Sequence, residues 1–524
     1  MKFRLPNGPS LAVLKPAALA ALSGLLLYAP FVEPRLFITA WVALVPLLFA
    51  LRGRTLWQAW LLGTLCGVTA WALVSAWMAD FFTIFRGYQA PWNVLAAALY
   101  WLYAAQVFAL MAVAFQWLRR HTPVSTVVLL PVVFVAVYSL FPLMFHARLA
   151  ESQSAFLVAI QGVDLIGAHG MDFIIVLVNA LLYRLLAGGL SMPERRYVMP
   201  AAGIVVGVWF TYGALAAAWW SDEIDDWPTQ RIGIVQPDDR ATINIPPPPR
   251  GYSRTHPPEM EMSRALGRDG ADLVVWPESR FKGYFRQSGV RSAYARQVAA
   301  MGVPLLFHDL ERETSEGGDR DYNTAAVLDA DGELAGVYRK IKRVAFGEYV
   351  PVLSQIGPVR RVVAHYFGDF LREITPGTEL SSVAVGDMVL VPRICYESAF
   401  PVFIARGFGA DGAGRILVFQ SMNNWFGETR QPFIHMRQSL LRAVENRVPM
   451  VHAINNGPSV VARPDGRIVM RTEAFVRGTF SADMPYSTSV GGSFFSRYPW
   501  LALSMIYLAF VGLALDAWRR RRRG

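Results

Sequence analysis

Long apolar stretches are the feature of this sequence that most constrains how the chain folds. A helix needs about 20 consecutive apolar residues to cross the hydrocarbon core of a bilayer, so windows of about 17 to 25 such residues predict membrane spans. Eight windows fit, and they lie near residues 11–30, 36–51, 56–80, 92–117, 123–145, 169–189, 198–220 and 498–518. Lys15 and Pro16 interrupt the first window, and the second is short, so these two are the least regular. We therefore expect a membrane α-helical bundle of about eight helices, with seven in residues 1–220 and the last, followed by a basic tail, in residues 497–524.

The composition agrees with a membrane location for much of the chain. Hydrophobic residues make up 54% of the 524 residues and charged residues only 17%, which is too apolar for an ordinary soluble protein of this length. The formal net charge is +11, but the basic residues gather at the ends of the apolar stretches, so we expect contact with anionic lipid and no nucleic acid partner. The stretch LLLYAPFVEP in the first window has no small-residue cleavage site, which predicts a retained helix rather than a signal peptide.

The positions of lysine and arginine predict how the spans are oriented, because these residues concentrate on the cytoplasmic side of a membrane. When eight spans are counted, all the basic groups near span ends fall on one side: Lys2 with Arg4, Arg52 with Arg54, Arg119 with Arg120, Arg195 with Arg196, and Arg519–Arg523. This pattern predicts that both termini lie in the cytoplasm and that the segment 221–496 lies outside it.

Residues 221–496 have a different pattern, in which short apolar runs of strand length alternate with helical patterns. The runs are 231–236, 271–278, 303–308, 324–332, 381–397 and 415–421, and the helical patterns cover 258–268, 288–301 and 431–447. Buried strands that alternate with helices indicate an α/β layered domain, and about 275 residues are enough for one large core. Four consecutive prolines at 246–249 are incompatible with a helix interior or a central strand and predict a rigid surface loop.

Three polar residues of this domain stand at the ends of apolar strands, where α/β folds usually place their sites. They are Glu278 in LVVWPES, Lys340 in GVYRKIKRVAFGEYVP and Cys395 in VPRICYES. Each of them alone is more often structural: a carboxylate that caps a helix, a solvated lysine, a small buried thiol. The two cysteines of the chain, Cys66 in an apolar stretch and Cys395 outside one, do not form a disulfide framework or a metal site.

Taken together and in this order, the three residues resemble the Glu-Lys-Cys triad of the nitrilase superfamily, which implies a four-layer αββα sandwich over residues 231 to about 480. Further motifs resemble the apolipoprotein N-acyltransferase family, in which a membrane domain of eight helices carries a nitrilase-like domain on the periplasmic side. These motifs are AWVALVPLLFAL (40–51), VAFGEYVP (344–351), CYES (395–398), NNWFG (423–427), RAVENRVPMVHAINNG (442–457) and PDGRI (464–468). The resemblance covers nearly the whole chain and implies a multi-pass protein of the bacterial inner (cytoplasmic) membrane.

The resemblance implies a two-step acyl transfer. Cys395 would be the nucleophile, Glu278 the general base, and Lys340 the positive charge that favours the thiolate and stabilises the oxyanion. A phospholipid would donate its acyl chain to Cys395, and the α-amine of a diacylglyceryl-cysteine lipoprotein would then accept the chain from the thioester. The resemblance implies no metal and no organic cofactor.

Seven neighbouring residues receive supporting or binding roles from the same resemblance. Glu348 matches an acidic residue that orients the lysine or helps proton transfer, and Tyr396 and Glu397 match the residues after the nucleophile. Phe346, Tyr349, Trp425 and Phe426 are candidates to line an acyl-chain pocket, and their alternative is ordinary core packing.

The sequence departs from the family in two loops. The loop that contains prolines 246–249 lacks the family's lysine-tryptophan pair, and Arg343 and Ala345 stand where leucine and proline are usual. These departures affect the expected substrate detail rather than the reaction class. Two other functions remain open from the residues alone: a membrane-tethered amidase or hydrolase in which water resolves the acyl-enzyme, and a non-catalytic lipid-binding protein.

Overall fold

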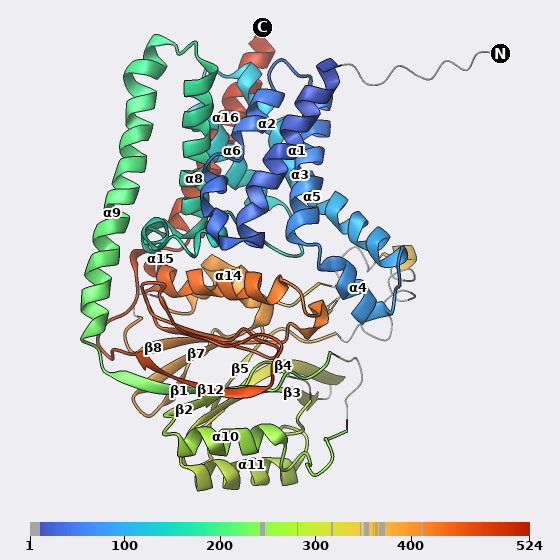
Figure 1. Cartoon of the computed structure of the whole chain (residues 1–524), viewed down its shortest axis with the longest axis vertical. Helices are drawn as coiled ribbons and strands as arrows, with labels where there is room; N and C mark the ends of the chain where they lie inside the picture. The colour runs from blue at the N-terminus through green and yellow to red at the C-terminus, as the bar shows by residue number, and fades with distance from the viewer. Residues whose placement is uncertain are drawn as a thin grey trace, which may run out of the picture. The chain divides into compact units, whose positions relative to one another are not determined.

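The computed structural model describes residues 11–241, 247–279, 281–315, 318–345, 347–349, 356–359, 361, 365, 373–409 and 412–523. It divides into two compact units. The chain up to Ala216, together with the residues from Trp500 onward, forms the first unit, and Ala217–Pro499 forms the second. Figure 1 shows the elements of both.

The first unit is a bundle of apolar helices (Figure 1). Within the described part of the chain, six helices are long and apolar enough to cross a membrane. They are α1 (Leu11–Val32), α3 (Leu56–Val74), α5 (Trp92–His121), α8 (Val163–Ala187), the helix Glu194–Asp225 that includes α9 (Met199–Asp225), and α16 (Leu501–Arg523). The predicted window 56–80 is divided, because α3 ends at Val74 and a separate helix, α4 (Met78–Arg86), follows it.

Two of the eight expected spans are shorter than predicted. The window 36–51 is divided into a 3-10 helix, η1 (Pro34–Trp41), and a short helix, α2 (Val45–Ala50). Pro46 explains the break, because its ring clashes with the carbonyl four residues earlier in a continuous helix. The window 123–145 contains α6 (Thr126–Leu140), and Phe141 before Pro142 takes extended backbone angles that end this helix.

Buried side chains form hydrogen bonds with the backbone groups that the break near Pro46 leaves without helical partners. The Asn179 side chain accepts a hydrogen bond from the Leu44 N–H (2.8 Å) and donates one to the Ala40 carbonyl (2.9 Å). The Ser23 hydroxyl accepts another from the Leu47 N–H (2.7 Å). An irregular backbone inside a bilayer requires such partners, because no water is present to supply them.

The second unit contains two six-stranded sheets. The first has the strand order β12 (Gly478–Pro485), β1 (Thr229–Gln236), β2 (Leu273–Val275), β3 (Leu305–Ser315), β4 (Gly318–Leu328), β5 (Leu334–Arg339). The second has the order β11 (Ile468–Arg471), β10 (Val460–Ala462), β9 (Met450–Ile454), β8 (Arg415–Ser421), β7 (Met388–Ile394), β6 (Val383–Val385). The neighbours β1–β2, β2–β3, β7–β8 and β8–β9 are parallel.

Successive side chains along each strand point to opposite faces of the sheet, and this alternation forms the layers of the unit. In β8, Ile416 and Val418 belong to the core between the two sheets, whereas Leu417 and Phe419 belong to the core on the opposite face. Helices α13 (Pro401–Arg406) and α14 (Gln431–Asn446) follow strands of the second sheet, and residues of both pack into that opposite core. Helices α10 (Pro258–Arg268) and α11 (Ser288–Met301) cover the outer face of the first sheet in the same way (Figure 1). The unit is therefore the αββα sandwich that the resemblance to the nitrilase superfamily implies.

The predicted apolar run 381–397 is not one strand. It forms the hairpin of β6 and β7, joined by a tight turn at Gly386 and Asp387, in which Gly386 has a φ of 56° that favours glycine. The run then leaves the sheet at Cys395, where the short helix η5 (Cys395–Ala399) begins. This exit places the cysteine at the carboxyl end of β7.

Candidate active site

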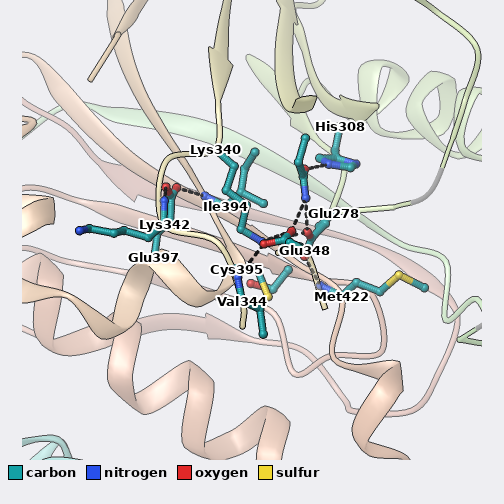
Figure 2. Close-up of polar contacts among 12 residues, drawn as sticks. Glu278, His308, Lys340, Lys342, Val344, Glu348, Ile394, Cys395, Glu397 and Met422 are labelled. Atoms are coloured by element: carbon teal, nitrogen blue, oxygen red, sulfur yellow. Dashed lines mark hydrogen bonds and ion pairs between the residues drawn. The ribbon is translucent and has the colours of Figure 1, made fainter. Parts of the chain in front are cut away.

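Four polar side chains predicted from the sequence meet at one end of the sandwich. Glu278 follows β2, Lys340 follows β5 and Cys395 follows β7, so two of these residues come from the first sheet and one from the second. Glu348 reaches the same place from the loop after Lys340. Figure 2 shows the ends of the side chains of Glu278, Lys340 and Glu348 converging beside Cys395.

Lys340 is a buried cation held between two carboxylates. Its side chain is 1% exposed, and its Nζ lies 2.8 Å from Oε1 of Glu348 and 3.5 Å from Oε1 of Glu278. Burial alone would lower the pKa of Lys340, but the charges of Glu278 and Glu348 outweigh burial and hold the pKa above its ordinary value. The site therefore carries a permanent positive charge at neutral pH.

Glu278 is held in its ionised form. Its Oε1 accepts a hydrogen bond from the Asn323 amide (3.0 Å), and its Oε2 accepts one from the Met422 backbone N–H (3.1 Å). Burial raises the pKa of Glu278, but the charge of Lys340, with a smaller effect from the Asn323 hydrogen bond, brings it below its ordinary value. An ionised carboxylate beside a thiol is suited to accept the thiol proton.

Cys395 occupies a strained position at the start of η5. Its φ is 51°, in the left-handed region that a non-glycine residue adopts only when the surroundings hold it there. Burial of the thiol and the negative charge of Glu278 raise its pKa, and the opposing effect of Lys340 is smaller. The resting thiol is therefore protonated and in contact with the ionised carboxylate of Glu278.

Asn323 is a site residue that the sequence reasoning missed. Its Nδ2 donates to Oε1 of Glu278 (3.0 Å) and to Oε1 of Glu348 (2.9 Å), and its Oδ1 contacts Nε2 of the buried His308. The amide thus bridges both carboxylates that flank Lys340. A buried asparagine just before the apolar end of β4, in the run DYNTAAVL, is the signal that could have revealed it.

Glu397 ties the lysine loop to the strand that carries the cysteine. Its fully buried carboxylate accepts hydrogen bonds from Tyr338 Oη (2.7 Å) and from three backbone N–H groups. These belong to Ile341 (2.8 Å), Lys342 (2.9 Å) and Ile394 (2.8 Å). The carboxylate lies on the far side of this loop from the cluster, and the Lys342 side chain points away from Cys395 (Figure 2).

The aromatic candidates have different environments. Tyr396 is half-buried and packs edge-on against Phe400, with ring centroids 5.0 Å apart. Tyr349 is half-buried beneath the Arg343 guanidinium, 4.6 Å from the ring centroid. Trp425 and Phe426 lie on the short helix η6 (Asn424–Phe426), just after Met422, with Trp425 half-buried and Phe426 buried.

Four further positions bear on the sequence predictions. Phe346 lies outside the described residues, as does Pro246 of the proline run. Arg343 donates to the Ile374 carbonyl (2.7 Å). Cys66 is buried within α3, and no group of three or more metal-binding side chains occurs among the residues that the structure describes.

Comparison with known proteins matches both units. The family model for carbon-nitrogen hydrolases matches residues 244–490, and the model for the apolipoprotein N-acyltransferase N-terminal domain matches residues 23–181. Among solved structures, an amidase from Nesterenkonia sp. is 20% identical, has a TM-score of 0.34, and covers 49% of this chain and 91% of its own.

Relatives match nearly the full length. The apolipoprotein N-acyltransferase of Geobacter metallireducens is 28% identical over 497 residues, which is 92% of this chain and 91% of the relative. That of Gloeobacter violaceus is 29% identical over 504 residues, 93% of this chain and 91% of the relative. With its apolar helices, the chain is a multi-pass membrane protein. It belongs to the apolipoprotein N-acyltransferase family, within the nitrilase superfamily.

Proposed function

We propose that this protein N-acylates lipoproteins by a two-step transfer through Cys395. An acyl chain moves from a phospholipid to the thiol, and the α-amine of a diacylglyceryl-cysteine at the N-terminus of a lipoprotein then takes it. The observation that carries this proposal is the buried cluster of Glu278, Lys340 and Cys395, in a chain whose membrane part matches the N-terminal domain of apolipoprotein N-acyltransferases.

The first step forms a thioester. Glu278 takes the thiol proton as the sulfur of Cys395 attacks the ester carbonyl of the phospholipid, and the Lys340 ammonium stabilises the oxyanion that develops. The ester C–O bond then breaks, and protonated Glu278 returns its proton to the departing oxygen. The products are the acyl-enzyme and a lysophospholipid.

The second step reuses the same groups. The neutral α-amine attacks the thioester carbonyl, Glu278 takes a proton from the nitrogen, and the C–S bond breaks with the thiolate as leaving group. Glu278 then returns the proton to Cys395, which restores the resting state and releases an amide. Because the pKa of Glu278 is lowered and that of Cys395 is raised, the proton returns to the thiol at the end of the cycle.

A membrane location gives the enzyme access to both substrates of this reaction. Each is anchored by acyl chains, and extraction into water would cost about 0.8 kcal/mol for every buried CH₂ group. An enzyme with apolar helices meets both substrates without this penalty.

The proposal is tested with the purified full-length protein in detergent. Incubation with phospholipid should add the mass of one acyl chain to the protein, and a diacylglyceryl-cysteine lipopeptide should then remove the adduct and gain that mass. Release of free fatty acid without acylation of the lipopeptide would instead indicate a hydrolase. Absence of both adduct and product would indicate a lipid-binding protein without this activity.

We further propose that the unit containing Cys395 lies on the periplasmic side of the inner membrane. The arginine pattern supports this placement, since the basic groups share one side when eight spans are counted. A reporter that is active only outside the cytoplasm should be active when fused near residue 230 or 490 and silent when fused after Arg523. The reverse pattern would contradict the proposed orientation.

The acid side of the pH profile should depend on Asn323. The pKa of Glu278 lies below the ordinary value of 4.5, so the base stays ionised to low pH and the rate of adduct formation is lost only as pH falls below about that value. Asn323→Leu removes a donor to the ionised carboxylate, which raises the pKa of Glu278 and should move the acid limb to higher pH.

The control for this variant is the next residue of the strand. Thr324 is fully buried, and its hydroxyl donates to Glu311 (3.0 Å) rather than to the cluster. Thr324→Val should therefore leave the acid limb in place. An unchanged limb in Asn323→Leu, measured by single-turnover acylation between pH 3.5 and 8, would contradict this role for Asn323.

A further inference from the structure

A buried histidine contacts the backbone of Cys395 and takes no part in the mechanism above. His435 lies on α14 and is 5% exposed. Its Nε2 is 3.1 Å from the Cys395 carbonyl oxygen and 2.9 Å from the Ser398 hydroxyl, and its Nδ1 is 3.0 Å from the side-chain oxygen of Asn423. These contacts join α14 to two different loops of the site.

The contacts determine where the histidine carries its proton. Burial lowers the pKa of His435 to about 4, so at neutral pH the ring is uncharged and has a single N–H. The Cys395 carbonyl can only accept, and the Ser398 hydroxyl donates to Gln438 Oε1 (3.3 Å) and so accepts from His435. The N–H is therefore on Nε2, directed at the turn that holds Cys395.

The other nitrogen, Nδ1, is then an acceptor and needs a donor. Among the residues described, the Nδ2 group of Asn423 is buried without a hydrogen-bond partner, while its Oδ1 faces Nδ1. Rotation of this amide by half a turn places Nδ2 against Nδ1 and satisfies both groups. Asn423 thereby fixes the tautomer of His435 in which Nε2 donates.

Asn423 is also adjacent to the residue that holds the base. The Met422 N–H donates to Oε2 of Glu278, so the segment 422–423 contacts both the base and the histidine. His435 thus connects the turn of the nucleophile to the segment that positions the base.

We propose that His435 is a positioning residue that sets the geometry between Cys395 and Glu278 through the Cys395 carbonyl and Asn423. The proposal rests on the proposed role of Cys395 as nucleophile. The proposal explains how Cys395, a non-glycine residue, keeps its left-handed backbone: the Cys395 carbonyl accepts a hydrogen bond from the buried Nε2 of His435. Replacement of His435 should slow the chemical step and leave the binding of phospholipid unchanged.

The test measures the single-turnover rate of adduct formation on the full-length protein at several phospholipid concentrations. His435→Leu should lower the rate at saturating phospholipid roughly 10- to 100-fold, because small displacements of reacting groups have effects of this size. The phospholipid concentration giving half the maximal rate should stay unchanged. His435→Gln keeps an N–H near the position of Nε2 and should recover much of the rate.

His452 provides a matched control. It is fully buried, lies between the hydroxyls of Ser421 and Ser439 at 2.7 Å from each, and packs edge-on against the ring of His435, with centroids 4.9 Å apart. His452→Leu should lower thermal stability about as much as His435→Leu while keeping most of the rate. If His435→Leu does not fold, the single variant Asn423→Ala replaces it and should have a lower rate than the wild-type protein. Adding Asn423→Ala to the His435→Gln variant should then lower the rate little further.

The outcomes separate this proposal from the proposed function. A wild-type protein that forms no adduct contradicts the function. A wild type that forms the adduct while His435→Leu does so at the same rate contradicts only the positioning role. Equal losses of rate in His435→Leu and His452→Leu, or no recovery in His435→Gln, would also contradict it, because general damage to the core would then explain the effect.

Discussion

Cys395→Ser should take up no detectable acyl chain from phospholipid, under conditions in which the wild-type protein gains the mass of one chain. A serine hydroxyl is far less acidic than a thiol, so Glu278 cannot remove its proton at a comparable rate, even with Lys340 beside it. The expected loss is on the order of 10⁴-fold or more, as for removal of other enzymatic nucleophiles. Intact-mass measurement after incubation with phospholipid checks it.

The second cysteine supplies the control for this experiment. Cys66 is buried within α3, and Cys66→Ser should form the adduct as the wild type does. Neutral hydroxylamine should remove the adduct from both proteins, because it cleaves thioesters. An adduct on Cys395→Ser equal to that of the wild type would rule out the thioester, as would a wild type that acylates lipopeptide without ever carrying a chain.

Lys340→Arg should lose most of the activity although it keeps the charge. The ammonium is 1% exposed and fits between Glu278 and Glu348, where a planar and larger guanidinium has no matching space. The donor would be displaced from the oxyanion, and loss of one such donor lowers a turnover rate about 10²- to 10³-fold. Single-turnover acylation and steady-state transfer to lipopeptide both measure the effect.

A second, half-buried lysine allows this loss to be separated from instability. Lys282 forms an ion pair with the buried Glu259, on the side of the domain covered by α10. Lys282→Arg introduces the same change of shape outside the cluster and should alter thermal stability with little effect on rate. Near-normal turnover of Lys340→Arg, or an equal loss of rate in Lys282→Arg, would show that Lys340 does not contact the reacting atoms.

Hydropathy predicted the long helices but not their interruptions. The windows at 92–117 and 498–518 became α5 and α16, because an unbroken apolar run of this length has few alternatives to a helix. The windows 36–51 and 123–145 were equally apolar but contained prolines, and the break near Pro46 persists because a distant residue, Asn179, satisfies its backbone. Hydropathy averaged over a sequence window carries no information about a hydrogen-bond partner that is distant in the sequence.

The amino-acid sequence by itself indicated most of the long helices, many of the strands and three polar residues at strand ends, because apolar periodicity and residue context are local properties of a chain. Only the tertiary structure decided what surrounds those residues. Lys340 meets Glu278, 62 positions away, and His435 meets Cys395, 40 positions away, because the sheets and α14 pack together. The protonation states follow from the same packing, since burial and the neighbouring charges set the pKa values of Glu278, Cys395 and His435. Asn323 and His435 remained unrecognised in the sequence because each functions through hydrogen bonds to residues that only folding brings near.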